Sequence, residues 1–130
     1  MGATLNTEGK GVMSIAITGT SGTAIGGVLN PEGVDVLILR ATWKITTAST
    51  GAATVNIGVG AAVNTDATDI INALAANGAV TGWYNGHVMQ NGAKTAITAP
   101  IWGAAQYVTF TGSAATTGLV ATLYLEYIRS

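Results

Sequence analysis

The sequence predicts an all-β fold, a jelly-roll-like β-sandwich of about eight antiparallel strands with one short helix in a connection. Apolar and polar residues alternate with a period of two along most of the 130 residues. Clusters of Gly, Ser, Thr and Asn separate the alternating runs, as they do in all-β proteins. This number of short strands in a chain of this length is typical of a jelly roll or a related sandwich.

The alternating runs give the expected strands in chain order. They are residues 12–18, 24–29, 36–46, 53–59, 80–84, 95–98, 106–111 and 119–128. Residues 1–11 are polar and contain glycine, with no pattern that would bury them. We therefore expect an extended N-terminal arm at 1–11 and a single β-sandwich domain at 12–130.

The short helix is expected after the fourth strand. Thr65 or Asp66 can cap its N-terminus, and Asp69 would lie in the first turn, where the helix dipole favours a carboxylate. Its apolar stripe would consist of Ile70, Ile71 and Leu74. The Asn77-Gly78 pair supplies a C-terminal stop.

Side-chain parity suggests two hairpins. Burial of one face places Ile45 opposite Val55 in the first hairpin and Phe110 opposite Ala121 in the second. The residues expected to point inward are Leu37, Leu39, Ala41, Trp43, Ile45, Ala53, Val55, Ile57, Val59, Val108, Phe110, Leu119, Ala121, Leu123 and Leu125. The outward faces are then rich in threonine and almost uncharged.

A few outward residues stand out on these hairpins. Arg40 and Lys44 are the polar anchors of the first outer face. Tyr107 and Tyr124 would lie beside each other on the second, as a candidate interface.

The charge content limits the kinds of partner that the protein can bind. Charged residues make up 8% of the chain, against roughly 25% in an average soluble domain, and the net charge is −1. No basic field is present to attract nucleic acid, and the low net charge suits a subunit inside an assembly. The most apolar stretch, residues 34–45, is interrupted by Asp35, Arg40 and Lys44, so no membrane partner is expected.

Residue types that carry chemistry are sparse. The chain has no cysteine, which excludes disulfides, thiolate zinc sites and cysteine nucleophiles. His87 is the only histidine, and a solvated loop histidine is its simplest interpretation. Asp66 and Asp69 match no calcium loop, and helix capping accounts for both. We expect no catalytic residue, no cofactor and no metal.

The aromatic residues divide into two groups. Trp43 has the parity of a core residue. Trp83, Tyr84 and Trp102 lie in or beside long connections, where a ring can anchor a partner, stack on a sugar or plug the end of the sandwich.

Several segments carry a resemblance to a known group of proteins. They are Asn30-Pro31-Glu32-Gly33-Val34 leading into a strand that ends near Arg40, the stretch 46–59, the segment 69–74 and the closing stretch 118–128. Across residues 28–130 the chain resembles small structural proteins of tailed bacteriophages. The resemblance implies a virion component, above all a capsid decoration or cement protein. Such a protein is often trimeric and would be made in the bacterial host cytoplasm before it joins the phage head.

The favoured hypothesis is a non-enzymatic decoration protein that binds the major capsid protein of an assembled particle and forms a homo-oligomer, most simply a trimer. The candidate interface residues are Leu5, Arg40, Lys44, Trp83, Tyr84, Trp102, Tyr107 and Tyr124. One alternative is a carbohydrate-binding module of a head fibre or tail, with Trp83, Tyr84 or Trp102 as stacking platforms. Another is a structural subunit of a tail or other tube.

Overall fold

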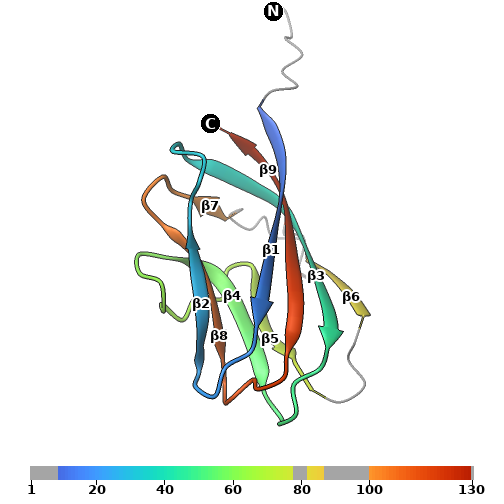
Figure 1. The fold of residues 1–130 in the computed structure, drawn as a ribbon. Coiled ribbons are helices and arrows are strands. Elements are labelled where there is room, and N and C mark those ends of the chain that lie inside the picture. Colours follow the sequence, from blue (N-terminus) through green and yellow to red (C-terminus); the bar gives the residue numbers. More distant parts are fainter. Residues whose placement is uncertain (1–8, 78–81, 87–99, 130) are drawn as a thin grey trace, which may run out of the picture.

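Two antiparallel β-sheets pack face to face in the computed structural model of the chain, which describes residues 9–77, 82–86 and 100–129 (Figure 1). The strands are β1 (Lys10–Thr18), β2 (Ala24–Leu29), β3 (Val36–Thr47), β4 (Thr54–Gly60), β5 (Ile71–Ala75), β6 (Gly82–Gly86), β7 (Ile101–Trp102), β8 (Tyr107–Gly112) and β9 (Val120–Arg129). Sheet A has the order β1-β9-β3-β6, and β7 also pairs with β3. Sheet B has the order β2-β8-β4-β5. The predicted all-β fold is confirmed at this level.

The chain crosses between the sheets at almost every connection. Among the described strands, only β4 and β5 are consecutive and also pair with each other. The first and last strands, β1 and β9, lie side by side in sheet A. The connections β3 to β4 and β8 to β9 are therefore crossovers and not hairpin turns.

The two predicted hairpins are consequently wrong. Ile45 lies opposite Ala121, and Val55 lies opposite Gly112 and Leu74. Phe110 of β8 is in sheet B, whereas Ala121 of β9 is in sheet A. The physical reason is that apolar parity requires only that one face of each strand be buried. The same face of a strand points into the core whether the next strand lies beside it in the same sheet or opposite it in the other sheet.

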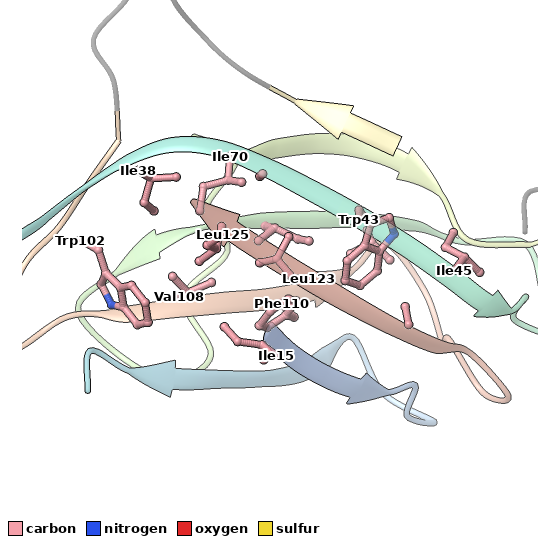
Figure 2. Close-up of a cluster of buried hydrophobic side chains, with 14 of the residues drawn as sticks. Ile15, Ile38, Trp43, Ile45, Ile70, Trp102, Val108, Phe110, Leu123 and Leu125 are labelled. Atoms are coloured by element: carbon pink, nitrogen blue, oxygen red, sulfur yellow. The ribbon is translucent and has the colours of Figure 1, made fainter. Parts of the chain in front are cut away.

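The core fills the space between the two sheets (Figure 2). Trp43 of β3 and Phe110 of β8 stack across the interface with their ring centroids 6.1 Å apart. The largest fully buried side chains are Trp43, Trp102, Phe110, Ile45, Ile57, Leu119, Leu123 and Leu125. The predicted core position of Trp43 is confirmed, and so are the inward positions of Leu119, Ala121, Leu123 and Leu125.

Most strand positions agree with the sequence, but the predicted parity fails in the first part of β3. The strand at 24–29 has the predicted bounds, and β6 overlaps the predicted strand at 80–84. In β3 a bulge between Ile38 and Arg40 shifts the alternation, so that Ile38 is buried and Leu39 is 40% exposed. Leu37 lies between the buried residues Val36 and Ile38 and is only half-buried, so the predicted inward positions of Leu37 and Leu39 are both wrong. The predicted strand at 95–98 lies outside the described residues.

The predicted short helix is also wrong. Residues 65–70 form an irregular connection, and Ile71–Ala75 is strand β5. Leu74 lies opposite Val55 and Ile71 lies opposite Ile57, so β5 holds one residue more than β4 over the same span. This bulge puts two core-facing residues three positions apart, which is the spacing of a helix stripe.

The bulge in β5 is held by side-chain and backbone contacts. Ala73 adopts a φ of 56°, in the left-handed region, and its N–H donates to Asn56 Oδ1 at 2.8 Å.

Residues 1–8 of the predicted arm lie outside the described residues, and β1 begins at Lys10.

Candidate functional site

The outer face of sheet B is partly covered by the chain itself. Residues 61–70, here called the covering segment, run from β4 back across this sheet (Figure 1). Asp66 Oδ1 of this segment accepts hydrogen bonds from Thr111 Oγ1 at 2.8 Å and from Asn56 Nδ2 at 3.0 Å. These hydrogen bonds lower the pKa of Asp66, with the one from Asn56 contributing most. Asp66 is thus a tether between the connection and the sheet, and not a helix cap.

Glycines allow the close approach of the covering segment to sheet B. A Cβ on Gly58 of β4 would lie 2.6 Å from the Cβ of Ala67. A Cβ on Gly27 of β2 would lie 2.6 Å from the carbonyl oxygen of Val63. Real Cβ atoms do not approach so closely, so these positions require glycine. The outer face of sheet B is therefore not the open threonine-rich surface that the sequence predicts, and Thr109 on this face is fully buried.

The outer face of sheet A is exposed among the described residues. Its outward residues on β1, Lys10, Val12, Ser14, Ala16 and Thr18, are all exposed. Those on β9 and β3 are exposed or half-buried. Of the two sheets, this is the one whose outer face the described part of the chain leaves uncovered.

Cross-strand register orders the residues of this face. Tyr124 lies opposite Ser14 on one side and Thr42 on the other. Arg40 lies opposite Glu126, and their side chains form an exposed ion pair with Arg40 Nε 3.8 Å from Glu126 Oε2. An exposed pair of this kind contributes little to stability. The pair is neutral overall, and it lies on a face that also carries Lys10 and Lys44 among hydroxyl and apolar residues.

The structure brings three of the predicted interface residues together. Arg40, Lys44 and Tyr124 share the outer face of sheet A, as their predicted outward parity requires. Tyr107 lies on sheet B, so its predicted position beside Tyr124 is wrong, because β8 and β9 belong to different sheets.

The other predicted interface residues lie on β6, on β7 or outside the described residues. Trp102 is fully buried, and its indole N–H donates to the carbonyl oxygen of Gln106 at 2.8 Å. It plugs the end of the sandwich and does not present its ring to a partner or a sugar. Trp83 and Tyr84 occupy β6, opposite Lys44 and Trp43 in the register. Leu5 lies outside the described residues.

An open groove of about 600 Å³ crosses one end of the outer face of sheet A. It is lined by Lys10, Gly11, Val12, Leu39, Arg40, Glu126 and Tyr127. Val12 is 70% exposed and Leu39 is 40% exposed, so the groove presents apolar side chains to solvent. Neither residue is among the interface residues predicted from the sequence, and the bulge in β3 brings Leu39, predicted to point inward, to this face.

A polar cluster closes the inner side of this groove. The Tyr127 hydroxyl donates to Glu32 Oε1 at 2.9 Å, and Arg129 Nε donates to Glu32 Oε2. The Arg129 guanidinium also lies 5.4 Å from the centre of the Tyr127 ring. Hydrogen bonds from Arg129 and then from Tyr127 lower the pKa of Glu32, while burial and the Glu32 contact raise the pKa of Tyr127. The cluster ties the turn before β3 to the last strand.

The arrangement of strands has a counterpart among solved structures. The chain superposes on a chain of the structure described as "Capsid of Ralstonia phage GP4" with a TM-score of 0.54, over 93% of this chain and 84% of that one. The fold is similar to that of a phage capsid chain. The sequence identity is 14%, so the likeness concerns the fold. No family model and no curated protein matches the sequence.

No group of three or more His, Cys, Asp or Glu in the described ranges is placed to hold a metal ion. His87 lies outside those ranges. No helix in the described part of the chain is long and apolar enough to cross a membrane.

Proposed function

We propose that this protein is a non-enzymatic structural component of a phage virion, which binds the outside of an assembled capsid and stabilises it. The observation that carries the proposal is the fold likeness to a phage capsid chain over 93% of the protein. The charged fraction of 8% supports it, because surfaces reserved for neighbours need few solubilising charges.

We further infer that the sandwich is a jelly roll. The orders β1-β9-β3-β6 and β2-β8-β4-β5 support this, because they divide eight strands between two four-stranded sheets. The ninth strand, β7, has two residues and adds to β3 outside this scheme.

The proposed contact with the major capsid protein is the outer face of sheet A. Val12 and Leu39 supply apolar area, Tyr124 supplies an aromatic ring, and Arg40 and Lys44 supply polar contacts at its edge. A protein that binds the assembled lattice and not the free subunits stabilises the lattice by mass action. A homo-oligomer, with a trimer as the favoured state, strengthens this binding by multivalency.

The test uses phage heads that lack the protein. Such heads are mixed with purified protein, and occupancy and the temperature of DNA release are measured. We expect saturable binding and a higher release temperature. Failure of the wild-type protein to bind, or binding without any rise in release temperature, would overturn the decoration role.

Two matched variants locate the contact. Val12→Asp places a charge on the outer face of sheet A, and Val63→Asp places one on the covering segment, where Val63 is 48% exposed. We expect Val12→Asp to reduce occupancy at least about tenfold, since burying an unpaired charge is costly, and Val63→Asp to bind as wild type. Equal binding by both variants would exclude this face as the contact.

The same preparations separate the other functions. Saturable binding to host polysaccharide would favour a carbohydrate-binding module, although the buried Trp102 removes one of its three candidate platforms. A copy number that matches the tail and not the head would favour a tail subunit.

A further inference from the structure

A cleft lies between the two sheets where the edges of β1 and β2 face each other. It has a volume of about 230 Å³ and is lined by residues 15–18 of β1, residues 25–28 of β2 and Phe110 of β8. Ile15 and Phe110 lie next to each other in this region of the core (Figure 2). We call this opening the edge cleft.

The strands that border the edge cleft are both at the edges of their sheets. Within the described residues, β1 pairs with β9 alone, and β2 pairs with β8 alone. Each strand therefore has one edge whose backbone N–H and C=O groups are not used in a sheet ladder. Such an edge is a template for the addition of another strand.

The lining of the edge cleft defines the chemistry of a suitable ligand. None of the lining residues is charged, and Ile17, Ile25 and Val28 are half-buried. A Cβ placed on Gly26 would have no atom within 4 Å, so space is open beside β2. The cleft suits an extended, uncharged segment with apolar side chains at alternate positions.

We propose that the edge cleft binds residues 1–5 of a second copy of this chain as an added strand. Met1, Ala3 and Leu5 alternate with Gly2 and Thr4, and none of the five is a charged residue. One face of such a strand places apolar side chains in the cleft, while the other carries small residues outward. Five extended residues span about 16 Å, close to the length that residues 15–18 present.

The position of the cleft along β1 favours a second copy as the source of residues 1–5. The chain enters β1 at Lys10, whereas the cleft begins at Ile15. If residues 6–9 turned back as a hairpin loop, residues 1–5 would lie beside residues 10–14 and not beside the cleft. Residues 1–5 of one copy thus complete the binding site of another. This inference does not depend on capsid binding.

Disulfide trapping tests the proposal directly, because the chain has no cysteine of its own. Thr4→Cys protein is mixed with Ala16→Cys protein, since Thr4 would point outward from the added strand and Ala16 borders the cleft, points outward from β1 and is exposed. The control acceptor is Ala61→Cys, which is exposed on the covering segment. We expect the mixed disulfide with Ala16→Cys to form at least about tenfold faster than with Ala61→Cys. Equal rates would overturn the proposal.

A chain that carries both cysteines distinguishes two arrangements: residues 1–5 bound to a second copy, which we call exchange, and residues 1–5 folded back onto their own chain. In Thr4→Cys/Ala16→Cys protein, binding to a second copy predicts that disulfides between chains form and that their rate rises with concentration. A concentration-independent disulfide within one chain would overturn the role of the second copy.

Self-association provides an independent measurement. By sedimentation velocity, Leu5→Asp is expected to weaken self-association at least about tenfold, because the charge would enter an apolar cleft, while Thr4→Asp retains it. Circular dichroism checks that both variants keep the sandwich. Unchanged association after deletion of residues 2–8, or a wild-type protein that stays monomeric at all concentrations, would refute the exchange.

Discussion

Removal of the Phe110 ring should weaken the link between the two sheets. Phe110 is 1% exposed, and its ring lies 6.1 Å from that of Trp43 with an angle of 27° between the planes. Because the two rings belong to β8 and β3, their contact joins sheet B to sheet A. We expect Phe110→Ala to lower the free energy of unfolding by about 3–5 kcal/mol, as found for buried phenylalanines.

The expected loss has two separable parts. Most of it is lost burial and the cavity left by the ring, and about 0.5–1.5 kcal/mol is the specific coupling of the aromatic pair. A double-mutant cycle with Phe110→Leu and Trp43→Leu isolates the coupling. The melting temperature of Phe110→Ala should fall by roughly 10–20 °C for a domain of this size.

The assay is guanidinium unfolding followed by far-ultraviolet circular dichroism, at one protein concentration for all variants. The control is Val12→Thr, which keeps a β-branched residue at a position that is 70% exposed and should change stability by less than about 0.5 kcal/mol. A loss below about 1 kcal/mol for Phe110→Ala, or a coupling of zero, would refute packing of the sheets through these rings.

The covering segment and the polar cluster give two further predictions. Gly58→Ala should lower the free energy of unfolding by about 1–3 kcal/mol, because its Cβ would lie 2.6 Å from that of Ala67. The control Gly51→Ala meets nothing within 4 Å and should not destabilise the protein. Equal urea midpoints for the two variants would contradict this prediction. The pKa of Glu32 lies below its usual 4.5, so its contribution to stability is present above that pH and is lost as the pH falls through the lowered native value. The stability difference between wild type and Glu32→Gln should therefore shrink from about pH 6 to about pH 3 in chemical denaturation, and a constant difference would argue against the ion pair with Arg129.

Strand positions could be predicted because they depend on local alternation. The strand at 24–29 has the predicted bounds, and the inward position of Trp43 follows from its parity alone. Pairing could not be predicted, because Ile45 is inward whether its strand pairs with the next one or crosses to face another sheet. That choice depends on contacts between distant parts of the chain.

The two local errors have a common physical cause. An extra residue in β5 gives Ile71 and Leu74 the spacing of a helix, and an irregularity in β3 turns Leu39 outward. Bulges are backbone features that shift parity, and no side-chain type at either position signals them.

The candidate site could be predicted only where it depends on the alternation of inward and outward residues. The outward parity of Arg40, Lys44 and Tyr124 follows from alternation, and all three lie on the outer face of sheet A. That Tyr107 lies on the other sheet depends on strand pairing, so the sequence pattern did not reveal it.

The position of β9 has a consequence for how the protein is made. The last strand lies between β1 and β3, so sheet A lacks a central strand until residues 120–129 have been synthesised. Folding of this sheet must therefore wait for the C-terminal part of the chain, and the pairing of β1 with β9 closes the longest loop in the described structure. A ribosome-bound chain shorter than this cannot present the assembled outer face, so binding through that face is restricted to chains whose translation has passed β9.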